Sequence, residues 1–291
     1  MFTSKSLIVS AFVLFSFISG CHRKTNESDP TVAFGTPLNM GSAELQYSVL
    51  VLGGQFGCSG VAVGPRHVIT AATCVGRFED LRTDPRFILE SKIEIISLAG
   101  QRPESIRAVS AVRHPYFKVA VGVNPLSATE MVSTDIALVV LEKPMQTNGV
   151  KIALPEQKLS APLKLTGFGS DENEFTNGRP RTAVSQPGWS GAKLDNGYGI
   201  VGFVKGDGVP CDGDGGAPAV SDGHLVGTVS MVRRNGINIC RSTESSTLTD
   251  VRMLRGWLKC SAGQMKFPLA QVNNANADRW CEKNEILHYK L

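Results

Sequence analysis

The chain has 291 residues, of which 42% are hydrophobic and 19% are charged, and its mean hydropathy is -0.01. This composition excludes a disordered chain, a collagen and a polytopic membrane protein, and the length suits one large β domain or two packed halves. The formal charge is +4 and no run of like charges concentrates it, so we expect no nucleic-acid partner.

The first twenty residues differ from the rest of the chain. Lys5 precedes a mostly apolar stretch at 7–18, which is followed by small residues and then by Cys21. Because this stretch is too short to cross roughly 30 Å of hydrocarbon, we interpret residues 1–20 as a secretory signal. Ile18-Ser19-Gly20-Cys21 resembles the bacterial lipobox, in which the signal is cut before a cysteine that is then acylated. A plain signal with a nearby cysteine is the alternative.

The lipobox resemblance implies an anchor in a lipid bilayer through acylated Cys21. Residues 21–34 then form a polar tether. Seven cysteines are an odd number for an exported chain, and setting Cys21 aside leaves enough for three disulfides. We therefore predict a lipid-anchored protein of the cell envelope. His22 follows the cysteine in place of the Asp associated with inner-membrane retention, which favours the outer membrane.

From residue 46 onward, the pattern is typical of β structure. Short runs rich in Val, Ile and Leu are separated by turn signals, which predicts an all-β sandwich or barrel. The expected strands cover 46–52, 60–63, 67–70, 92–98, 135–141, 163–168, 198–204, 217–220 and 225–230. Residues 195–197 (DNG) and 221–223 (SDG) are expected to form hairpin turns, since Asn and Gly tolerate positive φ.

One helix is expected late in the chain. Four apolar residues recur there at helical spacing: Val251, Leu254, Trp257 and Leu258. Thr247 is a candidate cap for this helix. Residues 260–291 follow as a C-terminal extension that contains two of the cysteines.

Four segments of the chain carry motifs in a fixed order. They are Cys58-Ser59-Gly60 with 65–74 (PRHVITAATC), then 134–138 (TDIAL), 166–169 (TGFG) and 211–218 (CDGDGGAP). These segments resemble C-G-G…W-V-L-T-A-A-H-C, N-D-I-A-L, G-W-G and C-x-G-D-S-G-G-P of the trypsin-like (chymotrypsin-family) serine proteases. The resemblance implies two antiparallel six-stranded β-barrels with a C-terminal helix. The trypsin-like domain would cover 35–259, with its halves meeting near 150–160.

Most of the residues that carry catalysis in that family are replaced here. Aligned by motif, the catalytic His falls on Thr73, the catalytic Asp on Asp135 and the nucleophilic Ser on Gly215. Glycine offers no nucleophile, and a Thr hydroxyl does not act as a base near neutral pH. We therefore interpret the chain as a serine protease homologue with a degenerate triad, which acts by binding a protein or peptide.

Other positions of the family's site are retained. Gly213 and Gly215 keep the backbone N–H groups of the family's oxyanion hole, which implies a carbonyl-binding notch. The alternative is that these glycines only serve the turn. Asp135 is expected to be a buried acceptor for Ser230, and for the Thr73 hydroxyl in place of the lost imidazole.

The activation switch and the specificity pocket also depart from the family. Trypsin-like enzymes are cut to expose an I-V-G-G amine, which pairs with the Asp at the position of Asp214. The equivalent segment here is 32–35 (VAFG), a poor match preceded by Thr31, so Asp214 needs another partner or its loop stays zymogen-like. Val209 falls at the base of the pocket, where trypsin has an acid, and no preference for Arg or Lys is expected.

The same resemblance implies the disulfide pairs Cys58–Cys74, Cys211–Cys240 and Cys260–Cys281. The first two match bridges of the family and leave the third. No H-E-x-x-H or C-x-x-C spacing indicates a metal, and no cofactor is expected.

The alternative function is an active serine endopeptidase with a non-standard site. Ser59 and Ser190 are the serines that lie near motifs. Gly188-Trp189-Ser190-Gly191 has a likeness to G-D-S-G, but it lacks the Asp and lies well upstream of Cys211. The histidines are interpreted as surface or packing residues, so they supply no replacement base.

Overall fold

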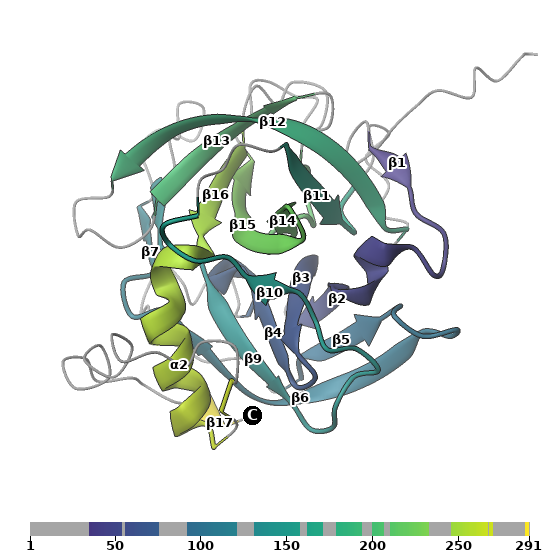
Figure 1. The fold of residues 1–291 in the computed structure, drawn as a ribbon. Helices are drawn as coiled ribbons and strands as arrows, with labels where there is room; N and C mark the ends of the chain where they lie inside the picture. The colour runs from purple at the N-terminus through teal and green to yellow at the C-terminus, as the bar shows by residue number, and fades with distance from the viewer. Residues whose placement is uncertain are drawn as a thin grey trace, which may run out of the picture.

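The computed structural model describes residues 35–53, 56–75, 92–120, 131–157, 162–170, 179–193, 200–206, 210–232, 246–266, 268–269 and 289–290. Strands dominate these residues, and two barrels lie one above the other (Figure 1). The predicted signal, the tether through residue 34 and Val209 lie outside them. Within the described residues, no helix is long and apolar enough to span a bilayer.

Six antiparallel strands close the first barrel. Their order is β6-β5-β2-β3-β4-β9, and β9 pairs back onto β6. The strands are β2 (Ser48–Gly53), β3 (Phe56–Gly64), β4 (His67–Thr70), β5 (Glu94–Ser97), β6 (Glu104–Arg113) and β9 (Ala137–Leu141). Side chains alternate between the two faces of a strand, and Val49, Val51 and Ile95 are among those in one buried cluster of this barrel.

Six further strands close the second barrel. Their order is β12-β11-β14-β15-β16-β13, and β13 pairs with β12. The strands are β11 (Leu163–Gly167), β12 (Arg181–Lys193), β13 (Ile200–Gly206), β14 (Pro218–Ser221), β15 (His224–Val232) and β16 (Ser246–Asp250). Leu165, Val229 and Leu248 belong to its buried cluster. The predicted all-β fold with two six-stranded barrels is confirmed.

Short elements lie around the barrels. They are β1 (Thr36–Pro37), β7 (Lys118–Ala120), β8 (Met131–Ser133), β10 (Lys151–Ile152) and β17 (Tyr289–Lys290), with the 3-10 turns η1 (Ala43–Gln46) and η2 (Ala72–Cys74). β1 pairs with β12, and β10 runs parallel to β15. The chain passes from the first barrel to the second between β9 and β11, a stretch that includes the predicted junction near 150–160.

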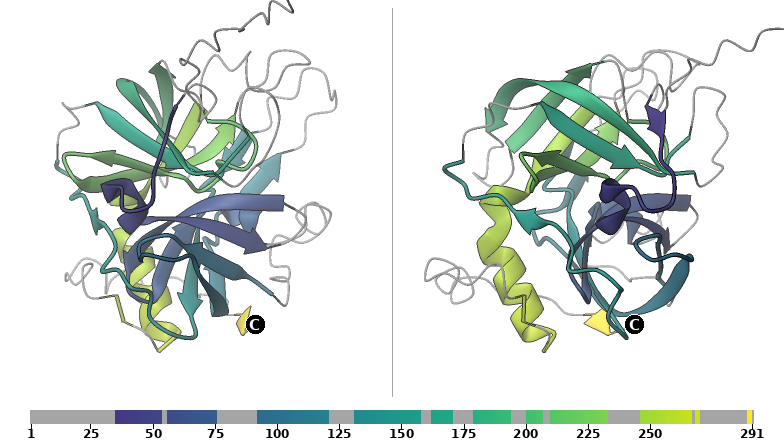
Figure 2. Two further views of the ribbon diagram at one scale, coloured as in Figure 1. Left: turned by 90° about the vertical axis from the view of Figure 1, so that its right-hand side faces the viewer. Right: turned by 45° about the vertical axis from the view of Figure 1, so that its right-hand side comes forward.

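The expected C-terminal helix is present, and it lies alongside the first barrel (Figure 2). The 3-10 turn η3 (Val251–Leu254) leads into α2 (Arg255–Gln264), so the helix extends beyond position 259. Trp257 and Leu258 are fully buried in one cluster with Leu138 and Val140 of β9. The neighbouring residues of β9 belong to the other cluster of this barrel, which explains why every residue of this strand is buried.

Two local predictions have different outcomes. Thr247 does not cap the helix, because it belongs to β16; the side chain of Asp250 instead accepts a hydrogen bond from the Arg252 N–H at 3.0 Å. The hairpin turn at 221–223 is present, with positive φ angles of 48° at Asp222 and 72° at Gly223. The turn at 195–197 lies outside the described residues.

Candidate active site

Asp135 is fully buried where the two barrels meet, and it accepts hydrogen bonds from both of them. From the first barrel, the Thr73 N–H donates to Oδ1 at 3.0 Å and the Thr73 hydroxyl donates to Oδ2 at 3.3 Å. From β15 of the second barrel, the Ser230 hydroxyl donates to Oδ2 at 2.9 Å. The expected contacts of Asp135 with Thr73 and Ser230 are therefore both present.

Two opposing effects determine the pKa of Asp135: burial and hydrogen bonding. Burial raises the pKa of this carboxyl to about 6, and hydrogen bonds from Thr73, Ser230 and the Ala72 backbone act in the opposite direction. No cationic side chain is among the causes of the shift. The charged form of Asp135 is thus stabilised by N–H and O–H dipoles alone.

A strained turn presents Asp135. Thr134 has a φ of 49°, in the left-handed region that β-branched residues avoid. The Ile136 N–H donates to the Thr134 carbonyl at 2.9 Å, so Asp135 lies at the tip of a tight turn just before β9. This geometry directs the carboxylate towards Thr73 and Ser230.

Gly215 lies against the disulfide of the first barrel. The predicted Cys58–Cys74 bond is present, and a Cβ added at Gly215 would be only 3.2 Å from the Cys74 Sγ. The Gly215 carbonyl also accepts from the Ser59 N–H at 2.9 Å. The loop therefore lies closer to the disulfide than a residue with a side chain ordinarily allows, and it carries no nucleophile at this position.

Ser59 joins the barrels and is not exposed as a nucleophile. Its hydroxyl donates to the Gly213 carbonyl at 3.0 Å and accepts from the Phe168 N–H at 2.9 Å. The residue is 0% exposed. Gly213 has a φ of 91°, which favours glycine. In the described part of the chain, the N–H groups of Gly213 and Gly215 donate no hydrogen bond, so the predicted notch stays open to test.

Asp214 is a second buried carboxylate, directly before Gly215. Its Oδ1 accepts from the Gly169 N–H and its Oδ2 from the Cys211 N–H, both at 2.8 Å. Burial raises its pKa to about 6; these backbone hydrogen bonds and the charge of Arg181 act against that rise, while the charge of Asp212 acts with it. Sequence reasoning missed Arg181, because no motif marks it.

Two glycines give Asp214 its place. A Cβ at Gly167 would be 1.9 Å from the Asp214 Oδ1, and one at Gly169 would be 2.6 Å from its Cγ. The carboxylate therefore rests directly on the backbone at the end of β11. This explains physically why the TGFG segment carries glycine at both positions.

The remaining predicted site residues are not brought into this centre. Ser190 lies on β12, but its side chain is outside the described residues. Cys211 and Cys260 are each disulfide-bonded to residues outside that part, so both pairings stay predictions. Among the described residues, no group of three His, Cys, Asp or Glu side chains is arranged to hold a metal ion.

His114 is buried in the core, and among the described residues its side chain is not a hydrogen-bond partner of Asp135. Its Nδ1 accepts from the Tyr116 N–H at 3.2 Å, and its ring lies 5.1 Å from the ring of Trp257. Burial lowers its pKa to about 3, so the imidazole is neutral across the physiological range. His114 is therefore a packing residue in this fold.

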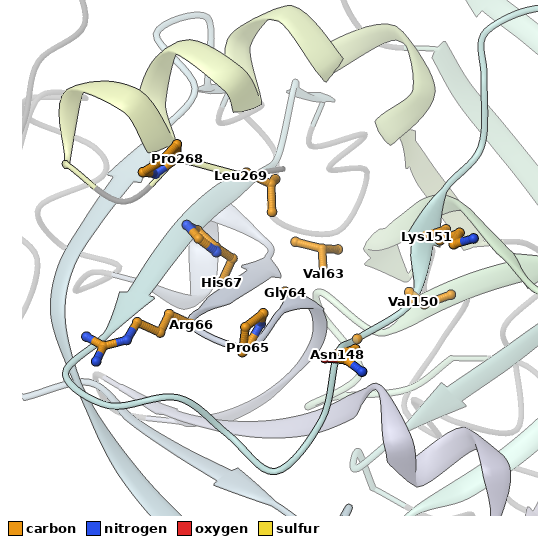
Figure 3. A pocket seen from close by; sticks show the side chains of 11 residues that line it. Val63, Gly64, Pro65, Arg66, His67, Asn148, Val150, Lys151, Pro268 and Leu269 are labelled. Carbon is orange, nitrogen blue, oxygen red and sulfur yellow. The ribbon is translucent and has the colours of Figure 1, made fainter. Parts of the chain in front are cut away.

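A hollow of about 470 Å³ lies beside the turn between β3 and β4 (Figure 3). It is bounded by the turn between β3 and β4, the segment leading into β10, and Pro268 with Leu269 after α2. His67 is on its wall, but none of the lining residues is Thr73, Asp135 or Gly215. We therefore do not assign the hollow to the candidate active site.

Comparison with known protein families identifies the family to which this chain belongs. The family model for trypsin matches residues 32–258, which include Thr73, Asp135 and Gly215. The chain belongs to the trypsin family. Trypsin-1 of Gadus morhua is 25% identical over 214 residues, covering 69% of this chain and 80% of that protein. Serine protease 1 of Rattus norvegicus is 25% identical over 226 residues, covering 73% and 83%.

Two solved structures share the fold of this chain. Neuropsin, a serine protease expressed in the limbic system of mouse brain, superposes with a TM-score of 0.56 at 22% identity, covering 77% of this chain and 97% of that one. A mutant of human heparin binding protein superposes with a TM-score of 0.57 at 17% identity, covering 80% and 97%. The chain therefore contains a trypsin-like serine protease domain.

Proposed function

We propose that this chain is a trypsin-like domain without catalytic activity, which is anchored to a membrane by lipid and acts by binding a protein or peptide. The observation that supports it is the set of groups around Asp135. Thr73 and Ser230 fill the carboxylate's hydrogen bonds, and neither is a base near neutral pH. Hydrolysis by this family's mechanism needs an attacking oxygen and a proton acceptor, and Gly215 and Thr73 supply neither.

No substitute for the lost groups is found among the described residues. Asp135 is fully buried and already accepts three hydrogen bonds from Thr73 and Ser230. The Ser59 hydroxyl is buried and used in the contact between the barrels. His114 is neutral and lies against Trp257. These contacts favour binding over an endopeptidase with a non-standard site.

The proposed binding site is the surface at the loop 211–216. The N–H groups of Gly213 and Gly215 donate to no described acceptor, so they suit the oxygen of a carbonyl or carboxylate. An extended peptide would lie along the end of β15, beside Ser230, and pair with it by strand addition. In this proposal, the N–H groups of Gly213 and Gly215 serve recognition and not chemistry.

The lipid anchor is the second part of this proposal. Acylation of Cys21 would hold the domain at the envelope, and His22 in place of the Asp associated with inner-membrane retention favours the outer membrane. The measurement is labelling of the cells with a fatty-acid probe. We expect labelling of the wild-type chain and none of Cys21→Ala; equal labelling of both would contradict the anchor.

Activity is tested on the mature protein purified in detergent, with trypsin as the positive control. We expect no reaction with an active-site fluorophosphonate and no cleavage of unfolded casein. Turnover that is lost in Ser190→Ala or Ser59→Ala would show an active endopeptidase instead. Circular dichroism of each variant separates loss of activity from loss of fold.

Binding at the loop 211–216 is tested with pairs of peptides that end in a carboxylate or in the matching amide. We expect the carboxylate peptides to bind more tightly and to shift the amide NMR signals of Gly213 and Gly215. Equal binding of both forms, with these signals unmoved, would mean that the glycines only serve the turn.

A further inference from the structure

The loop that carries Gly215 is held by a carboxylate that water does not reach. Asp214 is 1% exposed, and its two oxygens accept one backbone N–H each, from Gly169 and Cys211. These two bonds tie the loop to the end of β11 and to its own first residue. Asp214 therefore contributes to the position of the loop, beside the bonds that Ser59 makes to the carbonyls of Gly213 and Gly215.

With only two backbone N–H donors, Asp214 is costly to bury as an anion, and a positive charge nearby lowers that cost. Two N–H dipoles recover only part of the hydration that a carboxylate loses, and a charged partner recovers more. The family resemblance implies that a new N-terminal amine fills this role after the chain is cut. The segment here that corresponds to that amine, 32–35, matches the I-V-G-G motif poorly.

Arg181 is on the correct face of the sheet to provide the charge. It is the first residue of β12 and lies directly opposite Gly167 in the antiparallel ladder with β11. Residues directly opposite each other in such a ladder have their side chains on the same face. A Cβ at Gly167 would point at the Asp214 Oδ1, so the Arg181 side chain extends on the face where Asp214 lies.

Arg181 is half-buried, and part of its guanidinium is out of contact with water. Its Nε and Nη1 atoms are buried, and its charge lowers the pKa of Asp214 against the effect of burial. Asp212 is the other charged residue that acts on Asp214, and it acts in the opposite direction. On its far edge, β12 at Arg181 pairs with Pro37 of β1, so the arginine lies within an ordered ladder.

We propose that Arg181 is a positioning residue that supplies the positive charge for Asp214, so that the loop at 211–216 reaches its folded arrangement in the uncut chain. The tether and β1 then remain continuous with the domain. This inference holds whether the domain binds or cleaves, and its test does not use activity.

The experiment is hydrogen exchange measured by mass spectrometry on the full mature chain, with an intact N-terminus verified by its mass. We expect the amides of Gly169 and Cys211 to be protected in the uncut wild-type protein. Arg181→Met should lower that protection at least tenfold, Arg181→Lys should retain most of it, and the exposed neighbour Arg179→Met should leave it unchanged. Protection that appears only after a cut near residue 32 would overturn the proposal.

Charge is separated from shape by pH and by a second substitution. Asp214 is more costly to bury when it is ionised, so Arg181→Met should lose more protection at pH 8 than at pH 5. In an Asp214→Asn background, Arg181→Met should have little further effect. If Arg181→Met and Arg181→Lys both fail to fold, or if the loss is the same at both pH values, the role of Arg181 is packing and the proposal is wrong.

Discussion

The two buried carboxylates of this domain, Asp135 and Asp214, are stabilised by different kinds of partner. Both have a pKa raised to about 6 by burial. Asp135 accepts from one backbone N–H and two hydroxyls of Thr73 and Ser230, with no cation among the causes of its shift. Asp214 accepts from two backbone N–H groups and is subject to the charge of Arg181.

The difference shows what each position tolerates. A side-chain partner can change with one substitution, and the hydroxyls of Thr73 and Ser230 are partners of this kind for the buried Asp135. Backbone partners are fixed by the fold, and at Asp214 they also require glycine at positions 167 and 169. The partners of Asp135 can therefore change by single substitutions, while the Asp214 loop has little freedom to change.

The largest effect is expected from Asp214→Ala. It leaves the N–H groups of Gly169 and Cys211 buried without an acceptor, which costs about 3 kcal/mol of unfolding free energy at the usual penalty for such groups. Asp135→Ala leaves one N–H and two hydroxyls that rotate to new acceptors, so we expect about 2 kcal/mol. Urea denaturation with matched slopes measures both, and a larger loss for Asp135→Ala would reverse the comparison.

The two buried carboxylates make the free energy of unfolding depend on pH, and His114 contributes a pH dependence of opposite sign. A pKa raised from 3.8 to about 6 makes the folded state most stable below pH 3.8, and that stability is lost as the pH rises through 6. The pKa of His114 is lowered from 6.5 to about 3, so its contribution is present above pH 6.5 and is lost as the pH falls towards 3. The two effects have opposite signs in the same window.

The substitution His114→Asn therefore separates the pH dependence of stability that is due to the two carboxylates from that due to the imidazole. Asn keeps an acceptor for the Tyr116 N–H and does not titrate. Relative to the variant, the wild type should lose about 2 kcal/mol between pH 7 and pH 5, which is the cost of keeping one imidazole neutral over that range. The variant itself should become more stable on acidification. Parallel curves for the two proteins would show that His114 is not buried as described.

Backbone strain also differs between the Asp135 turn and the Asp214 loop. The positive φ angles of the Asp214 loop, 91° and 82°, fall on Gly213 and Gly216, whereas the turn before Asp135 places Thr134 at 49°. Asn tolerates this conformation better than a β-branched residue. Thr134→Asn should raise the melting temperature, by an amount equivalent to about 1 kcal/mol. A lower melting temperature would mean that contacts of the buried Thr134 side chain outweigh the strain.

Much of the fold could be predicted from the sequence, because a strand is marked by the alternation and type of the residues within it, which are neighbours along the chain. The segments at 67–70 and 163–168 have runs of β-branched and apolar residues, and both form strands nearly as expected. β6 and β12 were missed. β6 mixes Glu, Arg and Ser with its apolar residues, and β12 contains Pro187 and two glycines beside a break in register, so neither strand shows a clean alternation.

The residues of the candidate site could be predicted from the sequence, but the residues that hold them in place could not. Thr73, Asp135 and Gly215 stand within motifs that fix their order along the chain. Arg181 and the bridging role of Ser59 depend on contacts between elements far apart in sequence, such as β11 with β12 and β3 with the loop at 213–215. No local pattern records which strand lies beside which.

The smallest expected changes in stability come from removing the two hydroxyls that donate to Asp135. The Ser230 bond at 2.9 Å has ordinary geometry, while the Thr73 hydroxyl bond at 3.3 Å is long. Ser230→Ala should therefore cost about 1 kcal/mol and Thr73→Val about 0.5 kcal/mol, since Thr73→Val keeps the backbone N–H bond and the side-chain shape.

Because each hydroxyl lowers the pKa of Asp135, removing it should raise that pKa further and steepen the loss of stability above pH 6, more so for Ser230→Ala. Denaturation at pH 5 and pH 8 measures this slope for both variants. If Thr73→Val gave the larger change, the Thr73 hydroxyl would be the principal partner of Asp135. It would then have taken over the role of the family's imidazole in holding the carboxylate, and would not be a weak addition to the backbone bond.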